Sequence, residues 1–597
     1  MKRLIRYLKE YRKECIIGPV FKLLEAIFEL SIPIVMMNIL RRVNEYATWD
    51  PNSLTEAQRA VAKAPSSPTL YIIGMGVVLL LLGAIGLACA LTAQFFAAKA
   101  ATGMATSLRR DMFQQINYLS YNELDKVGTS TLISRMINDV NQVQTALNLT
   151  LRLVLRSPFV VFGAMIMAFT IQGDMGAIFI LVIAVLSVIV FGIMLKTLPI
   201  MKNTQKQFDK VLLSTRENLA GVRVVRAFNR EEDEKNSFYN ESNRLMGFQR
   251  VTAKWTALMN PLTYAVVNLG VLIILWWGQN KVRSATATID AASLIALVQY
   301  MSMILAELVK LANLIITLTR SVACGQRIVE VLELSSSIKD DNTYPASPAA
   351  NAPKIEFKDV SMRYVDAEED ALSKISFKIQ KGEMVGIIGG TGSGKSTLVN
   401  MIPRFYDASE GIILIDGRDI GGYPLKQLRN KIGIVPQQAT LFKGTIRDNI
   451  LWGSPGATDR EVNEALKTAQ ALNIVEEKQE KLDFMVEQGG RNLSGGQRQR
   501  LTIARALVRR PDILIMDDSA SALDFLTESN LRKAIREERK NMTMLIVTQR
   551  VASIMDADRI IVMDDGAIIG MGTHSELLDS CEAYREICAS QLTVEEV

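Results

Sequence analysis

The sequence predicts an all-α membrane domain of six spans with long cytoplasmic helical extensions, followed by an α/β domain. Two observations predict this order. Long stretches with little or no charge recur along the chain as far as Arg320, whereas short β-rich runs alternate with helical ones after Lys354. The mean hydropathy of +0.17 over 597 residues also favours a chain that is partly embedded in a membrane.

The membrane spans are read from the charge-free stretches. Residues 71–98 and 177–195 contain no charged side chain, and about 20 helical residues cross a hydrocarbon core of about 30 Å. Buried core helices of a soluble protein fit such runs poorly. The first span is interrupted by Lys22, Glu25 and Glu29. Within a membrane domain of residues 1–333, the predicted spans are about 16–40, 71–98, 153–171, 177–196, 258–278 and 291–317.

The orientation follows from the start of the chain. The opening segment MKRLIRYLKEYRK carries six basic side chains and one acid, with no signal-peptide pattern. The positive-inside rule therefore places the N-terminus in the cytoplasm, and we expect a multi-pass protein of the inner (cytoplasmic) membrane in contact with the lipid bilayer. The connections 99–152 and 196–254 then lie inside as helical stalks, and 41–70, 172–176 and 279–290 lie outside.

Composition excludes several other classes of protein. The net charge of +6 (68 basic against 62 acidic side chains) is too small to require a nucleic-acid partner. A single histidine, His574, excludes histidine metal clusters. Five cysteines without a C-x-x-C pair make a zinc ribbon or a disulfide framework implausible. Residues 334–353, rich in Ser, Pro, Ala and Asn, are predicted to link the domains, with the α/β domain at 354–597.

A glycine-rich loop between a strand and a helix marks a phosphate site. The pattern G-x-x-x-x-G-K-S runs from Gly389 to Ser396, and its backbone N–H groups and the following helix N-terminus suit phosphate charge. Lys395 would reach the β- and γ-phosphates, and Ser396 would ligate Mg²⁺. The candidate phosphate-binding residues are Gly389, Gly390, Thr391, Gly392, Ser393, Gly394, Lys395, Ser396 and Thr397.

A second motif of a nucleotide site is the apolar run DILIMDD, which ends in two acids. Asp517 at the strand tip would hold the Mg²⁺ shell, and Asp518 would lie beside the attacking water. These two elements alone leave a motor, a GTPase, a recombinase and a transporter open.

The run LSGGQRQRLTIARAL, residues 493–507, resembles the signature motif of the ATP-binding cassette (ABC) family. The resemblance implies that Tyr364 stacks on adenine, that Gln437 contacts Mg²⁺, and that SALD (residues 521–524, with Asp524) is the D-loop. It also implies that the signature binds the γ-phosphate of ATP held by another subunit, at a helix N-terminus. The signature residues are Ser494, Gly495, Gly496 and Gln497.

The membrane half extends the resemblance. NELDKVGTSTLISRMINDV and ENLAGVRVVRAFNREE resemble the intracellular loops of six-helix ABC exporters, whose short coupling helices dock on the nucleotide-binding domains. The order of membrane domain then ATPase in one chain is that of the exporter type. The resemblance implies ATP-driven transport by alternating access, with a second half-transporter as partner.

Two positions depart from the family pattern. Asp518 stands where the family has a catalytic Glu, and Gln549 stands where the switch motif has His. The shorter carboxylate lies about 1.5 Å further back, and glutamine cannot become cationic. Because the signature is intact, we expect a degenerate ATP site within a heterodimer. The alternative is a homodimer with two slow sites.

Three intramembrane acids bear on the substrate. Glu25 and Glu29 share one helical face and Glu307 lies in the sixth span, so we expect a cavity for cationic amphipathic or hydrophobic compounds. Pairing with Lys22 or Lys310 is the alternative. We expect multidrug export, that is, export of drugs or other amphipathic compounds, with lipid flipping or peptide export by the same fold as the alternative. A non-transporting ABC ATPase would need no hydrophobic spans.

Overall fold

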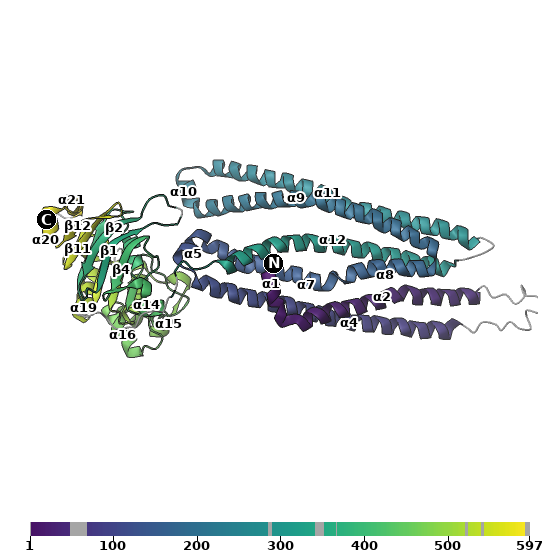
Figure 1. Cartoon of the computed structure of the whole chain (residues 1–597), viewed down its shortest axis with the longest axis horizontal. Helices are drawn as coiled ribbons and strands as arrows, with labels where there is room; N and C mark the ends of the chain where they lie inside the picture. Colours follow the sequence, from purple (N-terminus) through teal and green to yellow (C-terminus); the bar gives the residue numbers. More distant parts are fainter. Residues whose placement is uncertain are drawn as a thin grey trace, which may run out of the picture. The chain divides into compact units, whose positions relative to one another are not determined.

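The computed structural model describes residues 2–47, 68–283, 289–338, 340, 352–365, 367–519, 523–538 and 542–591 (Figure 1). It divides into two compact units. The first is Met1–Asn117 with Ser130–Leu334, and the second is Tyr118–Thr129 with Ser335–Val597. Of the predicted linker 334–353, residue 339 and residues 341–351 lie outside the described ranges, as do residues 48–67 and 284–288 of two predicted outer connections.

The first unit is entirely helical where it is described. Its long helices are α2 (Arg12–Ala47), α4 (Pro68–Tyr118), α7 (Val140–Leu153), α8 (Arg156–Ile171), α9 (Gly173–Ala220), α11 (Glu231–Arg283) and α12 (Ala291–Glu333). The short ones are α1 (Lys2–Ile5), η1 (Arg6–Tyr11), α6 (Thr129–Ser134), the π-helix η3 (Arg135–Asp139) and α10 (Val222–Ala227).

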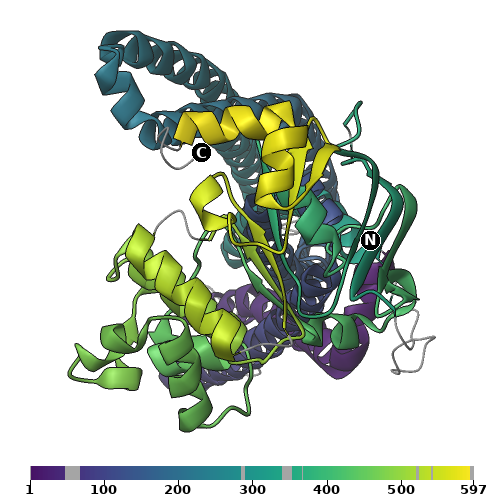
Figure 2. The same cartoon turned by 90° about the vertical axis from the view of Figure 1, so that its left-hand side faces the viewer.

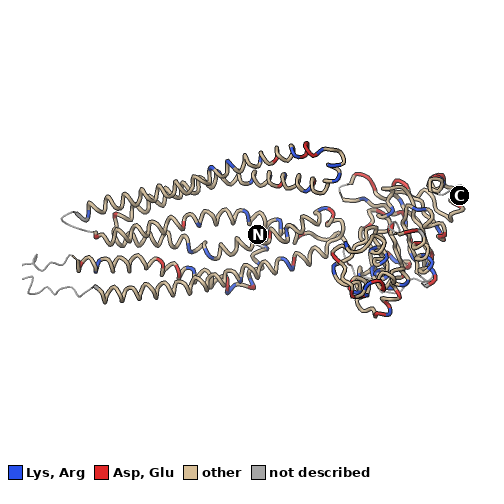
Figure 3. The backbone as a smooth tube through the Cα atoms, turned by 180° about the vertical axis from the view of Figure 1, so that it is seen from behind, with Lys and Arg blue, Asp and Glu red and all other residues tan. Residues whose placement is uncertain are grey.

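Six helical segments of the described chain are long and apolar enough to cross a membrane, which confirms the predicted six-helix membrane domain. Several are much longer than a bilayer requires, since α9 has 48 residues and α11 has 53. Figure 3 shows charged residues gathered toward the α10 end of these two helices and sparse over the rest. The segments are Arg3–Ala47, Thr69–Tyr118, Thr129–Ile171, Gly173–Ala220, Glu231–Lys281 and Ala291–Glu333.

Helix α12 lies at the centre of the first unit. It contacts α2, α7, α8, α9 and α11, and its Leu297, Tyr300 and Ile304 are fully buried. The Tyr300 hydroxyl donates a hydrogen bond of 2.6 Å to the Leu30 carbonyl of α2, so its one polar atom is satisfied inside the apolar core.

The second unit is an α/β domain built on two larger sheets. Six strands run in the order β12-β11-β3-β10-β9-β6, with parallel pairing from β11 to β6, and four antiparallel strands run in the order β2-β1-β4-β5. The strands are β1 (Ile355–Met362), β2 (Leu372–Ile379), β3 (Met384–Gly389), β4 (Glu410–Ile415), β5 (Arg418–Asp419), β6 (Ile432–Val435), β7 (Gly444–Thr445), β8 (Met485–Val486), β9 (Ile513–Asp517), β10 (Thr543–Val547), β11 (Arg559–Asp564) and β12 (Ala567–Gly572).

Helices surround these sheets. Those of the second unit are α5 (Tyr121–Val127), α13 (Lys395–Met401), α14 (Leu425–Asn430), α15 (Ile446–Leu451), α16 (Asp459–Thr468), α17 (Leu472–Glu476), α18 (Gly495–Leu507), α19 (Phe525–Glu538), α20 (His574–Ser580) and α21 (Glu582–Gln591). Single 3₁₀ turns are η4 (Ile420–Gly422), η5 (Lys481–Asp483), η6 (Gln488–Gly490) and η7 (Val551–Ser553).

The parallel strands bring three loops to one sheet edge. In the register of the sheet, Val547 at the end of β10 pairs with Asp517 at the end of β9 and with Ile387 of β3. All residues of β3, β9 and β10 are buried, as expected for strands covered on both faces. The segments that follow these strands therefore lie side by side.

Candidate nucleotide-binding site

The loop between β3 and α13 needs glycine at both ends. Gly389 has a φ of 156°, and a Cβ there would lie 2.0 Å from the Met563 carbonyl oxygen. Gly394 is the N-cap of α13 with a φ of 89°, where a Cβ would lie 2.8 Å from the Ala371 carbonyl oxygen. Side chains are excluded at both positions, so the loop backbone is open toward the helix N-terminus.

Lys395 is folded back into this loop. Its Nζ donates to the carbonyl oxygens of Gly390 at 2.5 Å and Gly389 at 3.0 Å and to Ser393 Oγ at 3.1 Å, and only 8% of the residue is exposed. Burial lowers the pKa of Lys395, and the nearby Asp517 and Asp518 oppose that shift. The ammonium group is thus held at the loop by weak acceptors that phosphate oxygens would replace.

Ser396 and Asp517 form the polar edge of the same pocket. Ser396 Oγ donates to Asp517 Oδ1 at 2.9 Å. Burial raises the pKa of Asp517 above its usual value, and the charge of Asp518 adds to the rise. A cation bound beside this carboxylate would relieve the cost of burying its charge.

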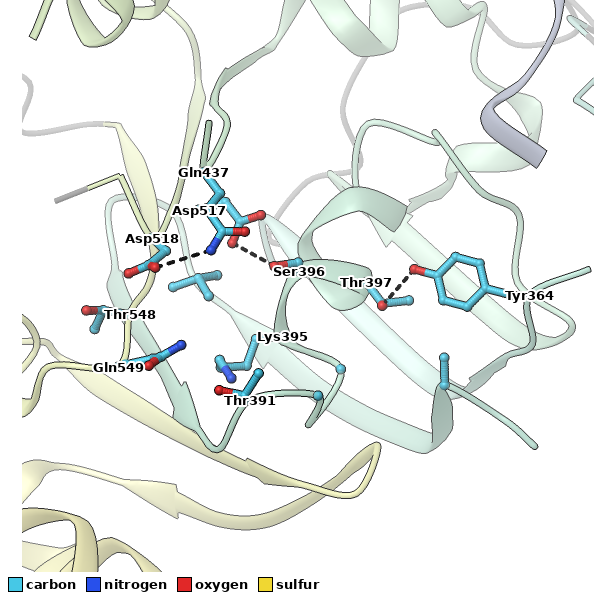
Figure 4. A pocket seen from close by; sticks show the side chains of 14 residues that line it. Tyr364, Thr391, Lys395, Ser396, Thr397, Gln437, Asp517, Asp518, Thr548 and Gln549 are labelled. Atoms are coloured by element: carbon cyan, nitrogen blue, oxygen red, sulfur yellow. Dashed lines mark hydrogen bonds between the residues drawn. The ribbon is translucent and has the colours of Figure 1, made fainter. Parts of the chain in front are cut away.

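Asp518 follows the strand in a left-handed conformation, with a φ of 43°. Its N–H donates to the Val547 carbonyl at 2.8 Å, and its Oδ2 accepts a long hydrogen bond of 3.4 Å from Gln437 Nε2. Figure 4 shows Asp518, Gln437 and Gln549 around one cavity that Lys395 and Thr391 also line. Asp518 and Gln549, the two residues that depart from the family pattern, therefore lie in the pocket of this chain's own glycine-rich phosphate loop (the P-loop, residues 389–396).

Tyr364 lies at the other end of the pocket. Its hydroxyl shares a 2.9 Å hydrogen bond with Thr397 Oγ1, and its ring packs edge-to-face on Tyr406 at 5.3 Å between centroids. Of the predicted loop residues, Thr391, Gly392, Gly394, Lys395, Ser396 and Thr397 line the pocket. Gly389, Gly390 and Ser393 lie behind them and hold Lys395.

The signature residues form a separate surface. Ser494 caps α18: its Oγ accepts from the Gln497 N–H at 3.3 Å, and Gln497 Oε1 accepts from the Ser494 N–H at 3.0 Å. Ser494 and Gly495 are exposed and, with Gly496, are not among the residues that line the pocket. Gln497 thus orders the helix start. Asp524 similarly accepts from the Thr527 N–H at 3.0 Å at the start of α19, whereas Ser521 lies outside the described residues.

The three membrane acids all face one arginine. Arg156, at the start of α8, contacts Glu29 and Glu307 at 2.5 Å each, and its Nε lies 3.9 Å from Glu25. Lys22 bonds Glu25 at 2.5 Å and Lys310 bonds Glu307 at 2.7 Å. The cluster contains three acids and three bases, so its formal charge is zero. Glu29 has the most exposed carboxylate of the three.

Sequence reasoning missed several residues around these sites. Arg156 marks only the boundary of a span in the sequence, although it joins α2, α8 and α12 in the fold. Helix α5 packs Tyr121 on Phe405 at 4.8 Å, and Tyr406 donates from its hydroxyl to Asp125 at 2.9 Å. In the sequence, Asp125 lies in NELDKV and Tyr406 lies in RFYD, and neither motif indicates that these two residues are partners.

Comparison with known proteins agrees with this architecture. Residues 15–308 match the family of the ABC transporter transmembrane region, and residues 372–521 match the ABC transporter family. The chain is 33% identical to the uncharacterized ABC transporter ATP-binding protein YfiB of Bacillus subtilis, over 99% of this chain and 98% of that protein. It is 30% identical to the ATP-dependent lipid A-core flippase of Hahella chejuensis, over 96% and 97% of the two chains.

A solved structure of a bacterial Atm1-family ABC exporter with ATP bound has the same fold. The TM-score is 0.77, the identity is 23%, and the alignment covers 98% of both chains. Six helices of the described residues are long and apolar enough to cross a membrane, and an ATP-binding domain follows them in the same polypeptide. This chain therefore belongs to the ABC transporter family as a multi-pass membrane protein with its own ATP-binding domain, and it has the fold of a bacterial ABC exporter.

Proposed function

We propose that this chain is one half of a heterodimeric exporter and supplies it with a degenerate ATP site and an intact signature. The observation that carries the proposal is the division within the second unit. Asp518 and Gln549 line this chain's own pocket, whereas Ser494 and Gly495 are exposed outside it. A signature that faces outward is suited to the P-loop of another subunit.

Asp518 and Gln549 are poorly equipped for hydrolysis. A general base has to lie within about 2.6–3.2 Å of its water, and Asp518 is one methylene shorter than glutamate. Its carboxylate also accepts a hydrogen bond from Gln437. Gln549 can donate to a γ-phosphate but cannot carry a positive charge. This site therefore binds ATP and turns it over slowly, while the partner's site performs most of the hydrolysis.

Mg²⁺ fits the oxygen donors of this pocket. Among the described residues no group of three His, Cys, Asp or Glu side chains is suited to a metal, which agrees with an ion that keeps several of its waters. Ser396 and Asp517, already 2.9 Å apart, and Gln437 would hold it. When bound, it would neutralise charge between the β- and γ-phosphates.

Transport is proposed to proceed by alternating access across the cytoplasmic membrane. In this proposal the basic N-terminal segment and the ATPase unit lie in the cytoplasm, and the positive-inside rule supports this orientation. ATP at both sites closes the two ATPase units, and coupling helices carry this motion to the membrane helices. Contacts of α5 support this route. Its Tyr121 packs on Phe405 and its Asp125 accepts a hydrogen bond from Tyr406, and Tyr406 in turn packs on the pocket residue Tyr364.

We infer that the substrates are hydrophobic or amphipathic compounds, drugs among them. Since Arg156, Lys22 and Lys310 balance the three membrane acids, selection of cations would depend on Glu29, the most exposed of them. A lipid flippase is the second candidate, supported by the 30% identity to a lipid A-core flippase along nearly the whole chain. Dye and fluorescent-lipid transport in proteoliposomes, with Glu29→Gln and Glu307→Gln variants, separates the two.

The heterodimer is tested by assaying the ATPase activity of this chain alone and together with a candidate partner half-transporter from the same organism. We expect the chain alone to hydrolyse ATP at least tenfold more slowly than the pair. Equal rates per ATPase unit would support a homodimer and overturn the proposal.

A further inference from the structure

The last turn of α21 binds the backbone of the segment that carries Gln549. Gln591 Nε2 donates to the Gln549 carbonyl oxygen at 2.7 Å, and Gln591 Oε1 accepts from the Val551 N–H at 2.9 Å. One side-chain amide thus satisfies two backbone groups that are two residues apart. A primary amide is suited to this because it presents a donor and an acceptor side by side.

Helix α21 is fixed by the core beneath it. Its Tyr584 and Cys588 are fully buried in the same apolar cluster as Val551 and Ile554. The Tyr584 hydroxyl lies 2.7 Å from His574 Nδ1 of α20, and both helices, yellow in Figure 2, pack at the β12 end of the six-stranded sheet. The position of Gln591 is therefore set by the core.

Other contacts fix the rest of residues 548–553, here called the switch segment. Thr548 Oγ1 accepts from the Arg550 N–H at 3.0 Å, and Arg532 donates to the Ser553 carbonyl at 2.6 Å. Between these points, the two bonds from Gln591 hold the backbone at Gln549 and Val551. Since the Gln549 side chain lines the nucleotide pocket, its direction depends on that backbone.

We propose that Gln591 is a positioning residue that holds the switch segment so that Gln549 faces the γ-phosphate of ATP. The C-terminal helix thereby tunes ATP retention in this chain's own site, without touching the nucleotide. The inference rests on the proposed role of Gln549 at the γ-phosphate.

The test compares Gln591→Ala and Gln591→Glu in the purified full-length chain. Alanine removes both bonds. Glutamate retains an acceptor for Val551 but places a carboxylate oxygen against the Gln549 carbonyl. We expect faster amide exchange at Val551 in the alanine variant. In both variants we expect ATP affinity to fall about three- to tenfold, the loss typical of one or two hydrogen bonds, with ADP affinity unchanged. Exchange mass spectrometry and calorimetric titrations with Mg-ATP and Mg-ADP measure these effects.

Two controls separate positioning from general damage. Ser590→Ala removes a hydroxyl that donates to the Ile587 carbonyl within α21, and this variant should change neither Val551 exchange nor ATP affinity. In a Gln549→Ala background, Gln591→Ala should no longer affect ATP affinity. The proposal is overturned if Gln591→Ala leaves either Val551 amide exchange or ATP affinity unchanged, or if it lowers ATP and ADP affinity equally. It is also overturned if Gln591→Ala lowers ATP affinity by the same factor in the Gln549→Ala background. Because all readouts concern this chain's own site, they are independent of whether its partner is a different chain.

Discussion

The two regions of the ATPase unit to which we assign ATP chemistry, the pocket and the signature, are built differently. In the pocket of the glycine loop, the polar side chains have partners within the unit: Lys395 donates to loop carbonyls, Ser396 donates to Asp517, and Gln437 donates to Asp518. At the signature, Ser494 and Gln497 bond each other and leave the start of α18 open to solvent. The first region is a closed set of contacts, whereas the second is an exposed helix N-terminus capped by Ser494.

The two regions also differ in how closely they follow the family pattern that the sequence resembles. The pocket contains the two departures from the family pattern, Asp518 and Gln549, and the signature contains none. If the pocket serves this chain and the signature serves the partner, damage to the two regions should have unequal effects on the assembled transporter. A homodimer would show equal effects, since every site would then use both regions.

The largest effect is expected from Gly495→Asp. A carboxylate at the first turn of α18 would repel the γ-phosphate and remove the attraction of the helix N-terminus. We expect ATPase activity of the assembled transporter to fall by a factor of about 100 or more, as for loss of transition-state electrostatic stabilisation elsewhere. Steady-state ATPase assays of the purified pair measure this.

The matched variant is Lys395→Ala in the same chain. It disables the proposed slow site, so the loss of activity should be about tenfold or less. Equal losses for Gly495→Asp and Lys395→Ala would contradict the assignment of different tasks to the two regions.

A second, smaller effect is expected when the pocket is restored with Asp518→Glu and Gln549→His. A longer carboxylate and a titratable imidazole would supply the missing base and charge, so hydrolysis at this site should rise at least tenfold. Single-turnover assays with a partner whose own P-loop lysine is replaced isolate this site. Asp518 has a φ of 43°, which aspartate tolerates better than glutamate, so a cost in unfolding free energy of about 1 kcal/mol is expected. An unchanged rate would mean that the two substitutions are neutral.

The features predicted well from sequence were those with local signals. Long charge-free runs identify membrane helices because burial of charge in lipid is costly. The glycine loop and the acid at the end of β9 are each recognisable because each motif is a short run of consecutive residues that also lie together in the fold. Strand β2 carries a weaker signal, since its alternation of buried and exposed residues is short and does not form a continuous apolar run.

Contacts between distant residues escaped prediction for the opposite reason. Arg156 pairs with Glu29 and Glu307, which lie 127 and 151 positions away in the chain. Helical spacing indicates only Lys22 and Lys310 as partners, because it reports neighbours within one helix. Gln591 likewise has no sequence signal, since its partners are backbone atoms, which any residue carries.

A third prediction concerns Tyr364, which the family resemblance assigns to stacking on adenine. Replacement by leucine removes the aromatic face, and stacking on a base is worth about 1–3 kcal/mol, so ATP affinity should fall about tenfold. Tyr364→Phe retains the ring and loses only the bond to Thr397, so the loss should be smaller. Inorganic triphosphate, which has no base, should bind both variants as it binds the unchanged chain. Weaker triphosphate binding would show that Tyr364 supports the loop rather than adenine.

The smallest effect is expected at the contact between α5 and the pocket. Tyr406 donates to Asp125 at 2.9 Å and packs on Tyr364, so it joins the loop between two membrane helices to the nucleotide site. Burial, followed by the hydrogen bond to Asp125, raises the pKa of Tyr406, so the hydroxyl remains a donor throughout the assay range. Tyr406→Phe removes this donor with little change in volume. We expect the ratio of substrate-stimulated to basal ATPase activity to fall about two- to fivefold, the size of one hydrogen bond. Asp125→Asn retains an acceptor oxygen, so this ratio should fall less than in Tyr406→Phe. An equal or larger fall would indicate that the charge of Asp125, rather than its bond to Tyr406, transmits the signal.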